Sequence, residues 1–415
     1  MSSFQPVRGT HDLLPEAFRQ HKWVTDTAQE VAERYGFDEM TPPVFEFTQV
    51  FSRTMGETSD VVTKEMYSFP SRSGDEQMTL RPEFTAGICR AFVSNQLYDQ
   101  APFKVFARGP LFRYERPQKG RQRQFHQIDV EIIGVPGPEA DIEVLAVGQH
   151  ILESLGVAEN VTLQLNSLGD PESRAAYREL LIAYLDPFQA DLSADSRERL
   201  HRNPLRVFDS KSDRDQEIIA GAPLLKDHLN DHSRAFFDEV CEGLTRLGIE
   251  YRHDPGLVRG LDYYTHTAFE FVTDTLGAQG AVIAGGRYDG LIEQLGGRST
   301  PGIGWAGGVE RLAMMADAGK RRRRPIAVIP LGAEAAVRAE MITRDLRKSG
   351  FMVEMSYSGN MKKRLNRANK ANAAAAVIIG EDELAGDAAT VRDMDSGEQT
   401  AAPFATLAEF LSPYR

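Results

Sequence analysis

A short basic segment stands out in an otherwise acidic chain. Residues 112–125 read FRYERPQKGRQRQF and contain a single acid, Glu115, although the formal net charge of the whole chain is −12. The cations of this segment are Arg113, Arg116, Lys119, Arg121 and Arg123. A solvated basic hairpin is one interpretation of such a run, and a binding site for a phosphate-bearing ligand is the other.

The segment TLRPEFTAG offers a second candidate site. It places Arg81, Glu83 and Thr85 at alternate positions, which share one face in an extended chain. A cation, an acid and a hydroxyl on one face suit a zwitterionic ligand, although a structural ion pair explains them equally well.

Two further segments combine arginine with tyrosine. LVRGLDYYTHTAFEF contains Arg259, Tyr263 and Tyr264 ahead of an alternating apolar pattern that predicts a strand, and AGGRYDG sets Arg287 and Tyr288 between glycines. Tyrosine hydroxyls beside an arginine either orient a polar ligand or cap a core. We expect that neither arginine is needed for folding.

A glycine-rich segment precedes a predicted helix. GIGWAGG matches GxGxxG through Gly302, Gly304 and Gly307, but the preceding LGGRSTP predicts no strand and no acid follows about 20 residues later. A dinucleotide-binding fold is therefore disfavoured. The glycines still permit close backbone approach, and the helix predicted over 309–319 carries Arg311 in its first turns, where an arginine reaches a bound phosphate.

Composition and absent motifs limit the remaining classes. The sequence has 41% hydrophobic and 26% charged residues, as an ordinary soluble globular protein has, and 415 residues allow two or more domains. No GxxxxGK[ST], HExxH or paired CxxC occurs, which argues against a P-loop hydrolase and a protein-bound metal. Two distant cysteines, Cys89 and Cys241, predict a reducing, cytoplasmic location, and no apolar stretch predicts export or a membrane span.

The first 320 residues predict an α+β domain with an antiparallel or mixed sheet. A helix is expected over 19–36, and strands are expected over 43–51, 103–114 and 126–134. The polar, helix-rich stretch 171–235 predicts an inserted subdomain.

A second domain is expected after four consecutive arginines. The linker is placed at 321–325, and the pattern of 326–380 predicts alternating strands and helices around a largely parallel sheet within a domain over 326–415. Its segment MKKRLNRANK holds five cations and no acid, which indicates either a solvated helix face or contacts with a phosphodiester backbone.

Taken in order, these stretches resemble the class II aminoacyl-tRNA synthetases and, more closely, the histidyl-tRNA synthetase family. TPPVFEF, with Pro43, is similar to the first class motif, FRYERPQKGRQRQFHQIDVE to the second and GIGWAGGVERLAM to the third. LVRGLDYYTHTAFEF and AGGRYDGL are similar to the two histidine-binding signatures. The resemblance spans nearly the whole chain and implies an antiparallel sheet flanked by helices, a helical insertion and a C-terminal α/β anticodon-binding domain.

The resemblance also implies site residues for ATP and tRNA. Arg113 would hold the α-phosphate, Glu115 would accept from the adenine amino group, Phe125 would stack on adenine and Arg311 would hold the γ-phosphate. The acceptor end of tRNA would meet the tip of the basic segment, at Arg116, Gln118, Lys119 and Arg121.

For histidine, the resemblance implies an α-amino site and an imidazole site. Glu83, Thr85 and Gln127 would bind the α-amino group, whereas Glu131 and Tyr264 would face the ring nitrogens. Tyr263 belongs to the same site, and Arg113 and Arg259 would hold the reacting phosphate and carboxylate oxygens. A carboxylate and a hydroxyl address both ring nitrogens, which distinguishes histidine from isosteres without donors.

The implied activity is ATP-dependent ligation of L-histidine to tRNA(His) through histidyl-adenylate by a homodimer. Mg²⁺ would arrive with ATP, and no dedicated protein cage for it is expected. Asp129 stands where the family usually has a small residue, and His126 is interpreted as structural. The alternative is a non-catalytic regulatory paralogue that acts on the first enzyme of histidine biosynthesis; such paralogues typically lack the anticodon domain.

Overall fold

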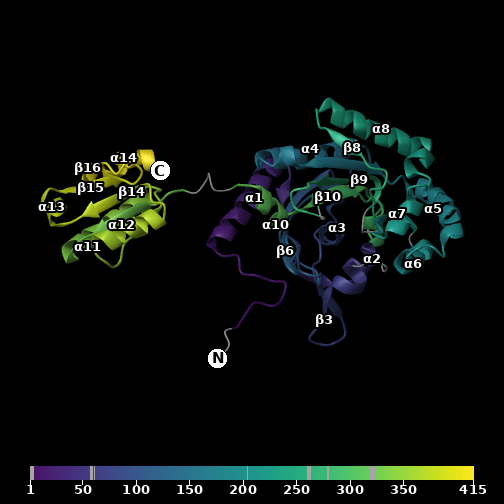
Figure 1. Ribbon diagram of the computed structural model, residues 1–415, viewed down its shortest axis with the longest axis horizontal. Helices are drawn as coiled ribbons and strands as arrows, with labels where there is room; N and C mark the ends of the chain where they lie inside the picture. Colours follow the sequence, from purple (N-terminus) through teal and green to yellow (C-terminus); the bar gives the residue numbers. More distant parts are fainter. Residues whose placement is uncertain are drawn as a thin grey trace. The chain divides into compact units, whose positions relative to one another are not determined.

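The chain folds into two compact units, Met1–Asp317 and Ala318–Arg415 (Figure 1). The computed structural model describes residues 4–56, 59, 61–202, 204–258, 263–277, 280–317 and 323–415. Among these residues, no helix combines the length and apolar character that crossing a bilayer requires.

An eight-stranded sheet organises the first unit. Its strands, in spatial order, are β1 (Asp38–Glu39), β5 (Phe103–Phe112), β6 (Gln124–Ile133), β11 (Gly302–Gly308), β10 (Ala281–Arg287), β9 (Thr265–Val272), β7 (Thr162–Ser167) and β8 (Tyr251–His253). The pairings are antiparallel except at the two edges, where β1 and β8 run parallel to their neighbours. The predicted α+β class is confirmed.

Alternation along β6 separates the core from the site. Ile128, Val130 and Ile132 are buried in the same cluster as apolar residues of the covering helices. These helices are α1 (Pro15–Arg34), α4 (Glu139–Ser154), α8 (Asp231–Arg246) and α10 (Val309–Met315). In Figure 1, α4 and α8 lie along one side of the sheet. The polar residues at the alternate positions of β6 therefore face the opposite side.

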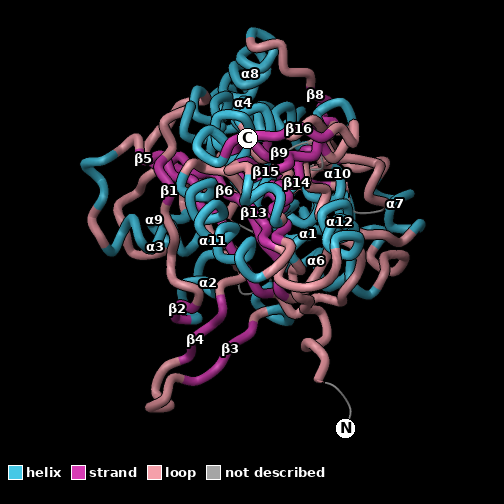
Figure 2. Tube along the Cα trace, turned by 90° about the vertical axis from the view of Figure 1, so that its left-hand side faces the viewer, coloured by secondary structure: helices cyan, strands magenta, loops and turns pink. Residues whose placement is uncertain are grey.

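On that opposite side, a small sheet and three helices enclose the site. The sheet consists of β2 (Phe45–Phe47), β4 (Gln77–Leu80) and β3 (Tyr67–Pro70), and the end formed by β3 and β4 projects from the unit (Figure 2). The helices are α2 (Thr48–Thr54), α3 (Thr85–Ser94) and α9 (Leu291–Gln294). The strand predicted over 43–51 was therefore wrong beyond residue 47, because the helical spacing of Val50, Phe51 and Thr54 buries one face of α2.

The stretch between β7 and β8 is helical among the described residues. It contains α5 (Pro171–Leu185), α6 (Ala194–Arg202), α7 (Asp213–Ile219) and then α8. Asp170 begins α5 as an N-cap, accepting a hydrogen bond from the Ser173 backbone N–H at 2.7 Å. The same stretch contains the short turns η4 (Asp186–Phe188), η5 (Pro204–Asp209) and η6 (Leu225–His228). Short turns elsewhere in the chain are η1 (Val61–Glu65), η2 (Leu97–Gln100), η3 (Ala158–Asn160), η8 (Phe404–Thr406) and η9 (Ser412–Tyr414).

The glycine-rich segment is itself a strand, β11, between β6 and β10. A Cβ added to Gly304 would lie 1.7 Å from Oε2 of Glu131, and one added to Gly302 would lie 2.2 Å from the Tyr288 ring. These glycines let two large side chains cross the strand. Their spacing reflects packing against neighbours in the sheet, so the GxGxxG match has a structural cause unrelated to dinucleotides.

The second unit has a five-stranded sheet, ordered β13 (Val353–Met355), β12 (Ile326–Pro330), β14 (Ala375–Ile379), β15 (Ala388–Asp393) and β16 (Gln399–Pro403). The three predicted strands are parallel, whereas β15 and β16 add an antiparallel hairpin that the sequence analysis did not assign. Its helices are α11 (Ala333–Lys348), α12 (Met361–Lys370), α13 (Glu381–Ala385) and α14 (Leu407–Phe410).

Candidate active site

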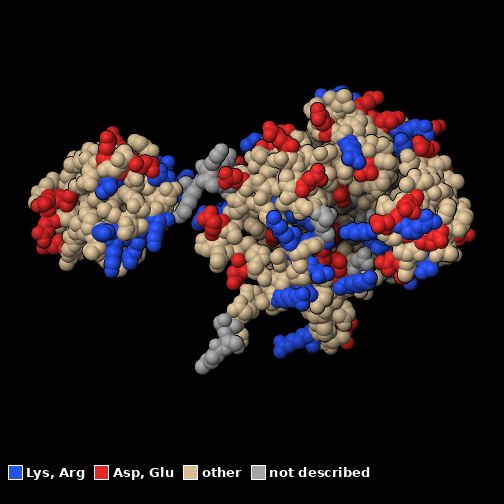
Figure 3. Space-filling model, in the orientation of Figure 1, with Lys and Arg blue, Asp and Glu red and all other residues tan. Residues whose placement is uncertain are grey.

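A pocket of about 350 Å³ opens on the polar side of the eight-stranded sheet. Residues that the sequence analysis assigned to histidine, ATP or tRNA line it together: Glu83, Thr85, Arg113, Glu115, Arg121, Phe125, Gln127, Tyr263, Tyr264 and Arg311. They come from four segments that span more than 200 residues of sequence, so antiparallel pairing of β6, β11, β10 and β9 brings them to one place. Figure 3 shows Lys and Arg side chains around a hollow in this unit.

The β5–β6 hairpin carries the basic segment. Arg113 donates through Nε to the Pro82 carbonyl at 2.9 Å, and its guanidinium carbon lies 5.3 Å from the centre of the Phe125 ring. Glu115 Oε2 accepts a hydrogen bond from Arg121 at 2.8 Å, so these two predicted residues form an ion pair. The remaining residues predicted to meet tRNA, Arg116, Gln118 and Lys119, are exposed on the hairpin loop and do not line the pocket.

The opposite end of the pocket is built from carboxylates. Glu83 accepts hydrogen bonds from the Ala86 backbone N–H at 2.8 Å and from the Tyr263 hydroxyl at 2.9 Å. These bonds fix it at the start of α3. Asp129 also lines this end, whereas the predicted residue Glu131 is fully buried and is not among the residues that line the pocket; it accepts a hydrogen bond from Thr85 Oγ1 at 2.6 Å.

Tyr288 also bonds to Glu131; the sequence analysis considered it only as a tyrosine beside Arg287 and assigned it no contact with histidine or ATP. Its hydroxyl donates to Glu131 Oε2 at 2.5 Å. The only sequence signal for Tyr288 was its place in AGGRYDG. The contact of its ring with Gly302 of β11 could not be predicted from this local pattern. Glu270, in strand β9, also lines the pocket and was missed, because its segment THTAFEFV was interpreted only as a strand pattern.

Burial makes this end of the pocket unfavourable for negative charge. It raises the pKa of Glu83, raises that of Glu131 to about 8 and, together with Glu131 and Glu83, raises that of Asp129 well above its usual value. Neither Asp129 oxygen nor Gln127 Oε1 has a hydrogen-bond partner within the described part of the chain. A cationic, donor-rich ligand would satisfy these acceptors.

The pH dependence of stability should report on Glu131. Its folded-state pKa of about 8 exceeds the ordinary value of 4.5, so its contribution to stability is complete below about 4.5 and is lost as the pH rises through about 8. We expect Glu131→Gln, which carries no titrating proton, to flatten this decline. Urea unfolding followed by tryptophan fluorescence measures it, because both tryptophans, Trp23 and Trp305, lie in the first unit. Equal pH profiles for the two proteins would contradict the assignment.

The other end of the pocket is cationic. Burial lowers the pKa of Arg311, and the nearby Arg121 and Arg113 lower it further. An anion between these guanidinium groups would reduce their mutual repulsion. The pocket therefore has hydrogen-bond acceptors at one end, which suit the ammonium group of an amino acid. It has cations at the other end, which suit the phosphates of a nucleotide.

Not every expected residue belongs to this site. Arg81 does not line the pocket: it donates to the carbonyls of Pro110 at 3.0 Å and Pro42 at 2.6 Å, because the chain turns into α3 after β4 and the expected shared face is lost. The expectation that Arg287 is dispensable for folding was also wrong, since it is fully buried in an ion pair with Asp141. Arg259 lies outside the described residues.

Comparison with known proteins agrees with this geometry. A family model described as histidyl-tRNA synthetase matches residues 9–170 and 174–312, and one described as anticodon binding domain matches residues 325–413. A histidine–tRNA ligase from Rhodospirillum rubrum is 58% identical over 415 residues, covering 100% of each chain. A histidine–tRNA ligase from Gluconobacter oxydans is 53% identical over 415 residues, also covering 100% of each.

Solved structures give the same relationship. The crystal structure of apo S. aureus histidyl-tRNA synthetase matches with a TM-score of 0.83 and 34% identity, covering 98% of this chain and 99% of that chain. An ATP phosphoribosyltransferase regulatory subunit/histidyl-tRNA synthetase from Bacillus halodurans shares the fold at a TM-score of 0.65 and 20% identity, covering 92% of this chain and 99% of that one. The matching family model and the relatives of more than half identity show that the chain belongs to the histidyl-tRNA synthetase family.

Proposed function

We propose that the pocket performs both half-reactions of histidine–tRNA ligation. A histidine carboxylate oxygen attacks the α-phosphorus of ATP, forming histidyl-adenylate as pyrophosphate leaves. A ribose hydroxyl of the terminal tRNA adenosine then attacks the acyl carbon, and AMP leaves. The observation that supports this most directly is one cavity with buried acceptors at one end and a guanidinium cluster at the other.

Histidine binds at the carboxylate end. Its α-ammonium group bonds to Glu83, Thr85 and Gln127, with Tyr263 holding Glu83 in place through the 2.9 Å hydrogen bond. The imidazole lies between Glu131 and Tyr264. A substrate without ring donors would leave these buried groups unpaired, and sites that hydrogen-bond a polar substrate group reject analogues lacking it by about 10⁴ or more.

ATP binds at the cationic end. Arg113 contacts the α-phosphate, Arg311 contacts the γ-phosphate and Phe125 stacks on adenine, while Glu115 accepts from the adenine amino group in exchange for its bond to Arg121. Arg259 acts with Arg113 on the reacting oxygens. Catalysis is then mainly positioning and charge stabilisation.

Mg²⁺ would be supplied with ATP and would neutralise part of the phosphate charge, because this ion is usually bound through substrate phosphates and one or two carboxylates. Glu270 lies beside Arg311 and offers a carboxylate oxygen on that side of the pocket. We place the reaction in the cytoplasm, where ATP, Mg²⁺ and tRNA are all present.

The tRNA contacts both units. Its acceptor end meets the exposed hairpin residues Arg116, Gln118 and Lys119, and Arg121 moves from Glu115 toward the RNA. In the second unit, Lys and Arg side chains gather where α12 lies (Figure 3), consistent with contacts to anticodon-loop phosphates. The regulatory alternative is disfavoured, because a non-catalytic regulator needs neither this basic helix nor a complete ATP pocket.

A homodimer is part of the same proposal. Val44, Phe45 and Phe47 follow the motif proline Pro43 and are 40%, 53% and 51% exposed, respectively. Apolar side chains of this size at one place favour a protein interface. Sedimentation of the full chain should give twice the monomer mass of 46.1 kDa.

The Glu83 assignment predicts a selective loss of histidine affinity. Glu83→Gln keeps the shape and the bond to Ala86 but removes the charge facing the α-ammonium group, and hydrogen bonds to charged groups contribute about 1.5–3 kcal/mol. We expect histidine binding to weaken by about 10- to 150-fold in calorimetric titration, with ATP affinity unchanged. Imidazolepropionate, which lacks the α-amino group, should bind both proteins equally; a matching loss for this analogue would place Glu83 elsewhere.

Histidine-dependent exchange of labelled pyrophosphate into ATP, without tRNA, tests the function itself. Exchange with histidine and not with other amino acids is the expected result. A folded protein that binds histidine but gives no exchange would point to the regulatory alternative.

A further inference from the structure

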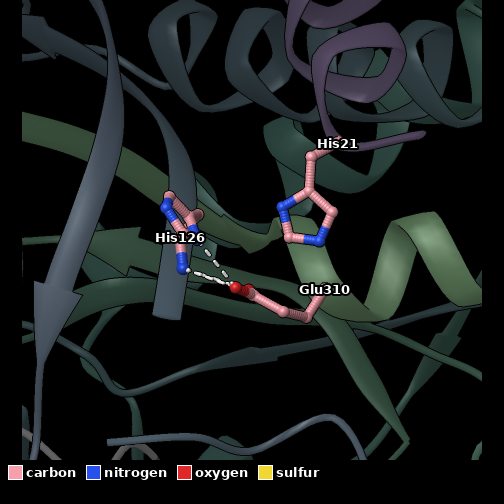
Figure 4. A group of neighbouring side chains, drawn as sticks. All are labelled: His21, His126 and Glu310. Carbon is pink, nitrogen blue, oxygen red and sulfur yellow. Dashed lines mark hydrogen bonds and ion pairs between the residues drawn. The ribbon is translucent and has the colours of Figure 1, made fainter. Parts of the chain in front are cut away.

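Two imidazoles and a carboxylate from distant parts of the sequence meet at the edge of the active-site pocket, where the carboxylate, Glu310, is one of the lining residues. They are His21 in α1, His126 in β6 and Glu310 in α10 (Figure 4). One potential ligand atom of each residue lies within 4.8 Å of those of the other two. None of the roles proposed above uses this cluster.

Hydrogen bonds already fix two of the three groups. Both oxygens of Glu310 lie 3.0 Å from the His126 backbone N–H, and Oε1 lies 2.8 Å from His126 Nδ1. The rings of His21 and His126 meet edge to face with centroids 5.5 Å apart. In contrast, His21 Nδ1 is buried without a hydrogen-bond partner among the described residues.

The protonation states suit a cation. Burial lowers the pKa of His21, which favours the neutral ring. Burial raises the pKa of Glu310, but its hydrogen bonds to His126 outweigh this, so the net pKa lies below the ordinary value and the carboxylate is charged. Metal ligation requires neutral imidazole and ionised carboxylate, so the resting cluster needs little change to bind an ion.

We propose that His21, His126 and Glu310 form a binding site for one divalent transition-metal ion, with Zn²⁺ the best fit. Two imidazoles and a carboxylate are a recurrent zinc ligand set that leaves a fourth position for water. Zinc at about 2.0–2.2 Å from each ligand brings ligand atoms closer together than 4.8 Å, so small side-chain rotations close the site. When the ion binds His126 Nδ1, it replaces the proton of the hydrogen bond between this nitrogen and Glu310 Oε1.

An open groove gives the ion access. A cavity of about 440 Å³ is lined by His21 and His126 together with Asp26 and Arg108, among others. Because His126 follows Phe125 and Glu310 precedes Arg311, a bound ion would tie the strand and helix that present the ATP pocket to α1. The sequence analysis missed this site because its ligands have no local spacing: they lie 105 and 184 residues apart along the chain, as the numbering of His21, His126 and Glu310 shows.

Metal titration of the chelator-stripped full chain tests the proposal. We expect calorimetry with Zn²⁺ to give one ion per chain, and Co²⁺ to give the visible absorption of a four-coordinate site. His21→Ala should weaken binding at least ~10-fold, because loss of even a residue that only supports a metal ligand costs about 10–100-fold. His150→Ala is the matched control: this histidine of the same unit contacts Tyr35, and its substitution should leave metal affinity unchanged.

Two additional measurements separate metal ligation from structural effects. His21→Gln retains a polar side chain, so wild-type melting without metal together with lost metal affinity would support the site. Zn²⁺ should raise the melting temperature of the wild-type chain and of His150→Ala but not that of His21→Gln. Absence of stoichiometric binding to the wild-type chain, equal affinity in wild type and His21→Ala, or loss of binding only in Cys241→Ser, would overturn the proposal.

Discussion

Replacing Arg113 by alanine is expected to slow histidine-dependent pyrophosphate exchange by about 10²- to 10³-fold, roughly 3–4 kcal/mol, the usual cost of losing a preorganised donor to developing charge. Arg113 is held in place by its bond to the Pro82 carbonyl and by the Phe125 ring, so its guanidinium is positioned before ATP arrives. The loss should appear in kcat rather than in the KM for histidine, because the contact strengthens as charge develops.

A matched control is Arg298→Ala. Arg298 also lies over an aromatic ring, with its guanidinium carbon 4.9 Å from the centre of the Tyr98 ring, but it is remote from the pocket lining. This variant should exchange pyrophosphate normally. Near-normal exchange by folded Arg113→Ala would remove Arg113 from the catalytic step and leave the α-phosphate to another cation.

The second large effect concerns stability. Arg287→Ala is expected to lower the free energy of unfolding of the first unit by about 3–5 kcal/mol, the typical cost of leaving one charge of a buried pair uncompensated. Both side chains of the Arg287–Asp141 pair are fully buried. Arg287 also donates to the carbonyls of Val135 at 3.0 Å and Gly137 at 2.8 Å and to Asp289 Oδ1 at 3.1 Å, so alanine removes a donor from four acceptor groups, Asp141 included.

Urea unfolding followed by tryptophan fluorescence measures this loss, because both tryptophans report on the first unit. Arg214→Ala, which removes an arginine from an exposed pair with Asp191, should change the unfolding midpoint far less, since solvent screens such pairs. A second comparison is Arg287→Leu combined with Asp141→Leu, which removes both charges and should recover part of the stability. An Arg287→Ala protein as stable as the Arg214→Ala protein would contradict this structural role.

Much of the chemistry was readable from local sequence. Segments that combine a turn, a charge cluster and a strand pattern lie close together in sequence, so the β5–β6 hairpin and the helix bearing Arg311 could be predicted from residues 112–125 and 302–312. The alternation of strands and helices over 326–380 likewise predicted the parallel part of the second sheet. Such patterns suffice wherever an element is stabilised by its own periodicity.

Predictions failed where a partner distant in sequence determines what a residue does. Arg81 and Glu83 were expected on one face of an extended segment. The strand β4 ends before them and α3 begins after them, so both lie in the connecting turn and their side chains do not share a face. The sequence analysis rightly disfavoured a dinucleotide site at the glycines of β11, but it could not give their structural reason, because Glu131 and Tyr288, which cross them, come from β6 and from the residue after β10.

The sequence by itself determined the order of motifs, the family resemblance and ten of the residues that line the pocket, because each motif keeps its residue types at fixed local spacing. Only the tertiary structure decided their physical state. The eight-stranded sheet buries Glu131, and this burial raises its pKa to about 8. Packing of helices against that sheet pairs Arg287 with Asp141 of α4 and brings His21 of α1 close to Glu310 of α10. Burial and charge–charge distance depend on what the rest of the chain places around a residue, and no local pattern encodes them.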